Sequence, residues 1–266
     1  MYDTILFNFS AIVAMIPASL LAMRRETSRD NFFWMVLGVA VTGPLVWVLA
    51  KIAGAWQTDL STALWTTIAA SMVIFAAIAA VTRHGWQLTP LISTYMVILG
   101  IVAAIWAQAP AKPLATGEIG NWFAIQIAVS IATYGLVTIA AVAALAAMLQ
   151  ERALKGKRPT PATRMLPSVA DCDQLMVRLL IISEIVLSVG LATGMAVQYG
   201  DSGRLLVLDH KTILTATAFA VIGALLVAHY RTGLRGRKAA RFVLLAYLLL
   251  TLGYPGVKFV TDVLLA

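Results

Sequence analysis

The sequence predicts an all-α membrane protein, folded as a single polytopic bundle of about eight transmembrane helices over residues 1–266. Composition is the first observation behind this prediction: 61% of the residues are hydrophobic and 12% are charged, against about 25% charged in soluble domains. Apolar runs of about 20 residues, enough to cross the hydrocarbon core, recur along the chain. Because lipid cannot satisfy backbone polar groups and these runs do not alternate strictly, we expect helices rather than a barrel.

The predicted spans are separated by short polar breaks. Arg24 and Arg25 end the first span, and Arg83 and His84 end the third. The longest break, residues 150–174, is rich in Lys, Arg and Pro and is predicted to be a loop. The predicted spans cover about residues 5–23, 32–50, 60–81, 88–107, 122–149, 175–197, 211–230 and 242–265.

The basic residues are distributed unevenly between the two sets of loops. Alternate loops carry most of the 20 Lys and Arg residues, whereas the opposite loops carry mainly Lys51, Lys112 and Arg204. The positive-inside rule predicts that the basic loops are cytoplasmic, so that the N-terminus and the C-terminus lie outside. We therefore expect a multi-pass protein of a bacterial cytoplasmic (inner) membrane. The net charge of +8 does not indicate nucleic-acid binding, because the basic residues lie in short loops between apolar runs, where they set orientation.

No pattern in the sequence predicts covalent chemistry. Cys172 is the only cysteine, so the chain has no internal disulfide and no Cys-x-x-Cys-His motif for covalent haem attachment. Neither a GxGxxG nor a Walker sequence is present, and no Ser-His-Asp constellation can be argued. We expect a protein that is not an enzyme by itself.

Two of the three histidines lie at opposite ends of one predicted span. His210 lies at the outer mouth of the span 211–230, after Asp209, and His229 lies at its inner end. A neutral imidazole is a good haem or metal ligand. Nineteen helical steps of 1.5 Å place the two roughly 28 Å apart, so they cannot hold the same iron. Two simpler interpretations stay open: an interfacial polar cluster for His210 and a membrane anchor for His229.

A polar stripe runs along the fifth predicted span. Gln126, Ser130 and Tyr134 repeat every four residues and therefore share one helix face. Such a stripe packs against another helix or lines a cavity, and the sequence leaves both possibilities open.

Glu184 lies near the middle of the sixth predicted span. An ionisable group at that depth is costly and is a functional candidate by default. It could stay protonated and hydrogen-bonded, pair with a base or line a wet cavity. Arg178 is a poor partner because it lies roughly 9 Å away along the axis and on another face. In the last span, Lys258 and Asp262 are spaced to pair across one helical turn.

The most distinctive stretches lie in the final third of the chain. They are His210-Lys211-Thr212, His229-Tyr230-Arg231, Gly233-Leu234-Arg235-Gly236-Arg237, Gly253-Tyr254 and Lys258-Phe259-Val260, with Leu175, Arg178, Leu191 and Gly194 before them. With these residues the chain resembles the cytochrome c assembly membrane proteins of the CcsA/HemX-like group, and within it the short inner membrane protein type represented by YpjD. Length, span number and topology extend the resemblance over essentially the whole chain.

The resemblance implies a haem-handling role, with non-covalently bound haem as the cofactor. The larger relatives present haem on a tryptophan-rich outer loop, whereas the segment from Tyr199 to Asp209 contains no tryptophan here. His229 falls near an intramembrane histidine of those relatives. The resemblance further implies other cytochrome c assembly proteins or apocytochrome c as partners.

The fifth span departs from the family at one position. The family usually has histidine there, followed by Ser or Ala four residues later and by Tyr eight residues later. Gln126 replaces the histidine, while Ser130 and Tyr134 keep the pattern. Because glutamine is a poor haem ligand, the resemblance leaves ligation by one histidine, with His210 as the candidate for the iron, or no haem at all.

Three hypotheses follow. The leading one is a haem-associated accessory protein for cytochrome c assembly, with haem bound near the outer face. The alternative is a small-molecule or ion-coupled permease that uses Glu184, although no duplicated halves are visible in the sequence. The third is a structural or regulatory membrane partner without haem, whose basic segment from Arg152 to Arg164 docks a cytoplasmic protein or anionic lipid.

Overall fold

The computed structural model describes residues 2–23, 28–52, 59–107, 121–157, 161–202, 210–234 and 236–256. All regular structure within these ranges is helical, which confirms the predicted fold class. The helices are α1 (Tyr2–Ser19), α2 (Asn31–Ile52), α3 (Leu60–Val81), α4 (Thr89–Ile105), α5 (Asn121–Gly156), α6 (Pro161–Met165), α7 (Val169–Ser202), α8 (His210–Thr232) and α9 (Arg237–Thr251). Short turns precede or follow some of them: η1 (Leu20–Met23), η2 (Gly85–Leu88) and η3 (Leu252–Gly256).

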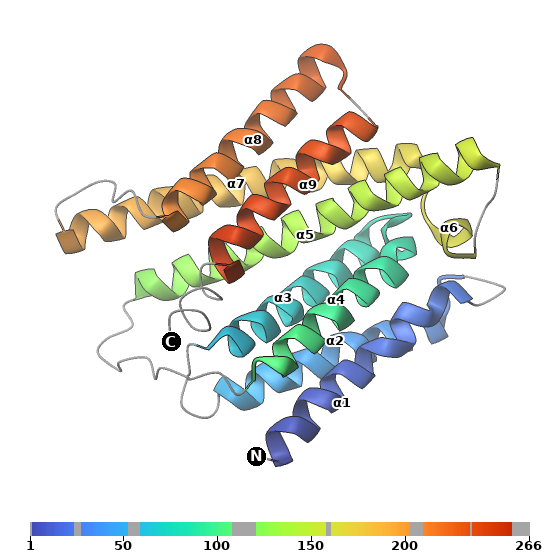
Figure 1. The fold of residues 1–266 in the computed structure, drawn as a ribbon, viewed down its shortest axis with the longest axis horizontal. Helices are drawn as coiled ribbons and strands as arrows, with labels where there is room; N and C mark the ends of the chain where they lie inside the picture. Colours follow the sequence, from blue (N-terminus) through green and yellow to red (C-terminus); the bar gives the residue numbers. More distant parts are fainter. Residues whose placement is uncertain are drawn as a thin grey trace.

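Six of the described helical segments are long and apolar enough to cross a membrane, and they lie in α2, α3, η2–α4, α5, α7 and α8. The described apolar part of α1 is shorter. Together with α9, these helices run alternately up and down the bundle (Figure 1). The start of α1 and the end of α9 lie at the same end of the bundle. That this end faces outward stays a prediction from the loop charges.

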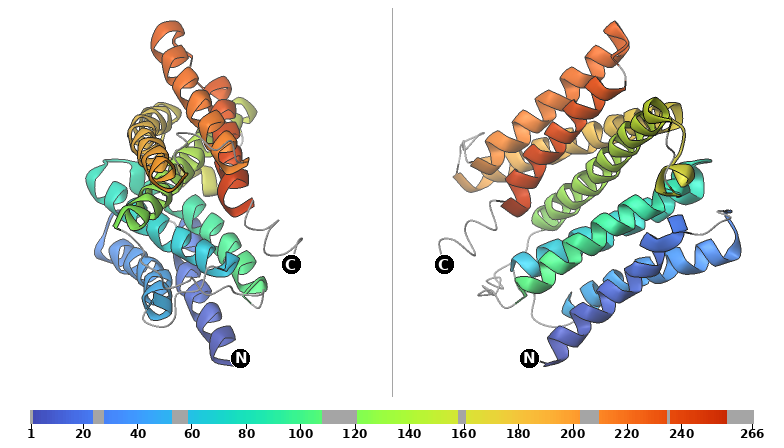
Figure 2. Two further views of the ribbon diagram at one scale, coloured as in Figure 1. Left: turned by 90° about the vertical axis from the view of Figure 1, so that its left-hand side faces the viewer. Right: turned by 45° about the vertical axis from the view of Figure 1, so that its right-hand side comes forward.

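The long helices of the described chain form two groups of four by their contacts, and Figures 1 and 2 show the two groups lying side by side. In the first group α1 packs on α2, α2 on α3, α3 on α4, and α4 returns to α1. In the second group α5, α7, α8 and α9 follow the same neighbour order, because α9 returns to α5. Contacts of α3 and α4 with α5 join the two groups.

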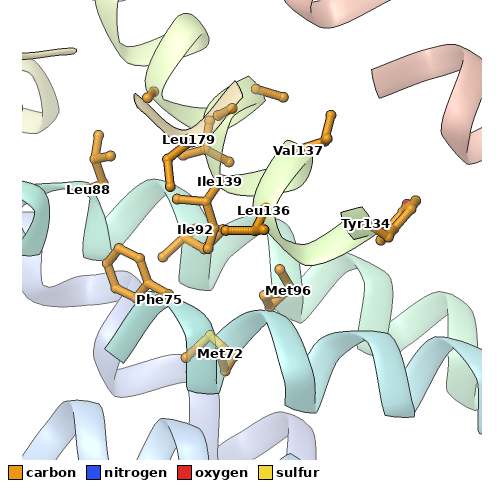
Figure 3. Packing of buried hydrophobic residues seen from close by; sticks show 14 of the residues in the cluster. Met72, Phe75, Leu88, Ile92, Met96, Tyr134, Leu136, Val137, Ile139 and Leu179 are labelled. Atoms are coloured by element: carbon orange, nitrogen blue, oxygen red, sulfur yellow. The ribbon is translucent and has the colours of Figure 1, made fainter. Parts of the chain in front are cut away.

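The core of the molecule lies around α5. Every residue from 133 to 144 is buried, so this stretch is enclosed on all sides. Its many alanines allow close neighbours, and a Cβ at Gly135 would lie 2.9 Å from Ile74 Cδ1 of α3. Figure 3 shows side chains of four other elements, α3, η2, α4 and α7, packed around Leu136 and Ile139 of α5; they are Met72, Phe75, Leu88, Ile92, Met96 and Leu179.

Some buried polar groups inside the first helical group make hydrogen bonds, whereas others, among them Trp65 Nε1 and Ser93 Oγ, have no partner among the described residues. Asp59 caps α3 and accepts a hydrogen bond from the backbone N–H of Thr62 at 3.2 Å. Trp47 of α2 donates its indole N–H to Asn8 Oδ1 of α1 at 2.7 Å, in a buried position. The same indole stacks on Trp65 of α3 with 5.3 Å between ring centroids. Trp47 therefore ties three helices together.

The prediction of a loop over residues 150–174 is wrong. Helix α5 continues to Gly156, α6 occupies 161–165, and α7 begins at Val169. The residues after Leu149 are polar, which predicts exposure to water, but they are also good helix formers. Glu151 and Lys155 pair one turn apart at 2.5 Å and support the extension.

The start of α7 is fixed by local hydrogen bonds. Ser168 Oγ accepts the backbone N–H of Asp171 at 3.2 Å, which is the usual signature of a helix N-terminus. Gln150 Nε2 donates to the carbonyl of Leu166 at 2.9 Å and to that of Pro167 at 3.2 Å. These bonds hold α6 and the start of α7 against the end of α5.

The last predicted span begins earlier than expected. α9 starts at Arg237 rather than at 242, and it passes at residue 252 into η3, a π-helical turn that contains Pro255. A proline inside a helix removes one backbone donor, and such turns are a known accommodation. Lys258 and Asp262 lie outside the described residues, so their pairing stays a prediction.

Candidate functional site

Helix α8 carries two of the candidate ligands. It begins at His210 and ends at Thr232, so the two histidines lie at opposite ends of one continuous helix. At 1.5 Å per residue they are roughly 28 Å apart, and each would need a site of its own. Asp209 and the side chains of His210 and Lys211 lie outside the part that the structure describes. The ligand role of His210 therefore stays a prediction.

The His229 ring is oriented by the turn that ends α8. Gly233, with a φ of +67°, reverses the chain, and its N–H donates to the His229 carbonyl at 3.1 Å. The reversal brings the Leu234 carbonyl oxygen to 2.9 Å from His229 Nδ1. Because a carbonyl only accepts hydrogen bonds, Nδ1 is the donor at this contact, and in a neutral ring Nε2 is the nitrogen with the free lone pair. Ligating histidines commonly have this arrangement.

His229 lines a cavity of about 570 Å³ between the start of α7 and the end of α8. This volume lies within the range of small-molecule sites. Arg178 contributes a cation to the wall, while Asp171 and Asp173 contribute anions. The remaining lining residues are Ala170, Gln174, Val177, Ile181 and Tyr230.

A smaller hollow of about 210 Å³ lies on another side of α7. Its wall includes Arg83 and His84 in the turn between α3 and α4. Asp171, Gln174 and Arg178 line both hollows, so the first turns of α7 separate them. His84 and His229 thus lie on different sides of the same helix end.

The polar stripe of α5 does not face one neighbour. A Cβ at Gly194 of α7 would lie 3.0 Å from Gln126 Nε2, so Gln126 packs on α7. Ser130 donates back to the Gln126 carbonyl at 2.8 Å. Tyr134 instead hydrogen-bonds to Tyr247 of α9 at 3.1 Å. A four-residue repeat drifts by about 40° per step, which accounts for the change of neighbour.

Tyr134 belongs to a hydroxyl cluster at the junction of the two helical groups. Tyr247 also hydrogen-bonds to Tyr95 of α4, and Tyr134 reaches Thr251 Oγ1 at 3.3 Å. The rings of Tyr134 and Tyr247 lie 5.7 Å apart. This cluster connects α4, α5 and α9, which favours a packing role for Tyr134.

Glu184 lies at the contact between α7 and α8. A Cβ at Gly223 of α8 would lie 3.1 Å from Glu184 Oε1. Its other oxygen, Oε2, is buried and has no hydrogen-bond partner among the described residues. No cation pairs with the carboxyl in the described part of the chain. Among the described residues no group of three or more His, Cys, Asp or Glu side chains could hold a metal ion.

A comparison with protein families decides what kind of protein this is. The family described as "Cytochrome C assembly protein" matches residues 32–265. The chain belongs to the cytochrome c assembly protein family. The resemblance seen in the final third of the sequence is thereby confirmed.

Some curated relatives of this cytochrome c assembly protein match it over its whole length, and others match only part of it. A 28.8 kDa protein encoded in the nifR3-like 5' region of Azospirillum brasilense is 53% identical over 270 residues and covers both chains completely. The inner membrane protein YpjD of Escherichia coli K12 is 25% identical over 189 residues, which are 70% of this chain and 69% of YpjD. Protein HemX of Brevibacillus brevis is 22% identical over 163 residues, 60% of each chain. No solved structure matches significantly.

These matches and the apolar helices establish a multi-pass protein of the cytoplasmic membrane, as predicted. Membership of the cytochrome c assembly family indicates a role in cytochrome c biogenesis.

Sequence reasoning missed Asp171, Gln174 and Arg178 as a group. Their spacing of three and four residues is that of one helix face. Because residues 150–174 were predicted to be a loop, this helical spacing was not applied to them. The capping residue Ser168, followed three residues later by Asp171, was the signal that could have found the helix.

Proposed function

We propose that this cytochrome c assembly protein handles haem in the membrane and binds it non-covalently through the histidines of α8. The observation that carries the proposal is the His229 ring: its Nδ1 is engaged by a carbonyl, its Nε2 is a potential ligand, and it lines a cavity of about 570 Å³. Neutral imidazole is a common axial ligand of haem iron.

The wall of that cavity offers one cation to haem. Arg178 lies in its wall and can pair with a propionate. Asp171 and Asp173 lie in the same wall and disfavour additional anions. The porphyrin itself is apolar and would lie against the apolar part of the wall, which includes Val177 and Ile181.

His210 is the second ligand in the proposal, at the opposite end of α8. Because the two rings are roughly 28 Å apart, one iron cannot reach both. His210 would therefore bind a haem at a separate site, and each such haem site is called a station below. Because Gln126 replaces the histidine usual in α5 of the family, each station would have one protein-derived histidine. The protein itself would carry out no covalent step, and its partners would be other assembly proteins or apocytochrome c.

The test is an optical titration of the purified full-length protein with haem, in the oxidised and the reduced state. His229→Ala and His210→Ala should each lower the haem stoichiometry, and the double variant should bind none. If one single variant loses all haem, the protein has one station and that histidine is its ligand. His84→Ala is the matched control, because it removes the third histidine and should leave the spectrum unchanged.

Two results would overturn the proposal. One is a wild-type protein without a haem band after titration. The other is a double variant of His229 and His210 that binds haem at wild-type stoichiometry. Arg178→Gln adds a further readout: it should weaken haem binding without altering the position of the bands, because it touches a propionate and not the iron.

An ion-coupled permease is the second candidate. It is favoured by the buried, unpartnered oxygen of Glu184 at the contact between α7 and α8. In each of the two groups the four helices contact one another in the same order, which also resembles the repeated halves of transporters. Uptake into proteoliposomes that is lost in Glu184→Gln would support it, and haem binding would be unaffected by that substitution.

A further inference from the structure

An apolar groove of about 370 Å³ lies between α8 and the start of α9. Its lining is almost entirely carbon. The row on α8 consists of Thr217, Ala220, Val221, Ala224, Leu225 and Ala228, and the opposite wall is formed by Leu234 and Phe242. The groove exists because small residues recur every four positions at Ala220, Ala224 and Ala228, where larger side chains would fill it.

The groove faces away from the rest of the molecule. Only 17% of the most apolar window of α8 is buried, against 67% for α5. Ala220 and Ala224 are exposed. Since α8 crosses the membrane, these positions meet lipid, and the groove is a depression in the lipid-facing surface.

The dimensions of the groove fit one hydrocarbon chain. From Thr217 to Ala228 it extends over eleven residues, roughly 16 Å, which is about half of the hydrocarbon core and therefore one leaflet. A volume of about 370 Å³ over that length leaves a cross-section on the order of 20 Å².

Both walls of the groove carry a cation at the same end. Arg231 lies three residues beyond Ala228 and continues the α8 row. Lys238 lies four residues before Phe242 on α9. Because α9 runs antiparallel to α8, Lys238 lies beyond the same end of the groove as Arg231. Both side chains are exposed, and neither makes a hydrogen bond or ion pair with the described residues. Each cation lies roughly one helical turn, about 5 Å, beyond the apolar lining.

We propose that this groove binds an anionic phospholipid of the phosphatidylglycerol class, with one acyl chain between α8 and α9 and its phosphate between Arg231 and Lys238. The length of one leaflet, the width of one chain and a pair of cations at the headgroup level together specify this ligand. Basic positions at the membrane surface attract anionic lipid. The lipid comes from the leaflet at the end of the bundle that carries the basic loops.

The test is native mass spectrometry of the full-length protein, released from mixed micelles that contain equal amounts of phosphatidylglycerol and phosphatidylcholine. The wild type should retain phosphatidylglycerol preferentially. Arg231→Gln and Lys238→Gln should each lower that preference about fivefold, and Ala224→Leu should remove the bound lipid of either kind because it fills the groove.

Matched controls separate the site from general charge and bulk. The double substitution Arg152→Gln, Arg164→Gln removes two exposed cations at the same end and should leave the preference unchanged. Ala216→Leu adds the same bulk to α8 at an exposed position outside the groove and should leave lipid binding unchanged.

Three results would overturn the proposal. In the first, the variant that lacks both Arg231 and Lys238 keeps the wild-type preference. In the second, Ala224→Leu retains as much lipid as Ala216→Leu. In the third, the wild type is a lipid-free dimer that Ala224→Leu converts to a monomer, which would assign the groove to a second copy of the chain.

Discussion

Glu184 of α7 and Gly223 of α8 are in direct opposition: a Cβ on the glycine would lie 3.1 Å from the Glu184 Oε1 atom. The absent side chain at position 223 is what gives the carboxyl room. Position 223 therefore limits how closely α8 approaches α7 beside the carboxyl.

The first prediction concerns this contact. Gly223→Leu should destabilise the packing of α8 on α7 by about 1–3 kcal/mol, because the added carbons displace the carboxyl. Glu184→Gln should be nearly neutral, since an amide has the same shape and no charge to bury. Unfolding in detergent would measure both. Gly156→Leu is the control, because no atom lies within 4 Å of a Cβ there.

The second prediction concerns the tyrosine cluster. Tyr247→Phe should cost about 1–3 kcal/mol, because its hydroxyl bonds to both Tyr95 and Tyr134 in a partly buried position. Tyr230→Phe should cost almost nothing, since Tyr230 is 69% exposed. Equal stability of the two variants would mean that the cluster does not hold α4, α5 and α9 together.

The third prediction uses Cys172, which is 0% exposed and contacts the Pro167 carbonyl. A thiol-reactive dye should not label the folded protein and should label it as it unfolds. The sole cysteine therefore reports the stability of the start of α7 without further substitutions. Labelling of the native protein at the rate of the unfolded chain would contradict the burial of this residue.

The fourth prediction tests orientation in the membrane. Because Cys172 is buried and should not react, the variant Arg152→Cys should be labelled by an impermeant reagent only from the cytoplasmic side, as the positive-inside rule requires. A cysteine at Lys112, in a loop predicted to lie outside, should react only from the opposite side. The reverse pattern in spheroplasts and inverted vesicles would show that both termini are cytoplasmic.

The fifth prediction concerns Gly233, whose φ is +67°. Gly233→Ala should cost about 1 kcal/mol, because residues with a Cβ rarely adopt this conformation. The strain should also disturb the hydrogen bond from His229 to Leu234, and a haem site at His229 should then lose affinity. Gly156→Ala, at a helical position, is the control for both stability and haem titration.

The features of this protein that depend on local sequence were predicted correctly. The helical fold and the membrane class followed from the apolar runs, because hydropathy is a local property of the chain. The segment 150–174 was mispredicted because its polarity was interpreted as the absence of a helix. Glu151, Lys155 and the Ser168 cap show that a helix can leave the membrane and continue in water.

The sequence by itself determined that this is a helical protein of the membrane, and its final third already indicated the cytochrome c assembly family. It also identified the separation of His210 and His229, since helical rise depends only on residue number. Only the tertiary structure decided that Gln126 packs on α7 while Tyr134 turns to α9, and that Leu234 orients the His229 ring. It also decided which residues share the cavity and the groove. The physical reason is that such contacts depend on how helices rotate and pack against one another, and neither quantity is encoded in the hydropathy of a single span.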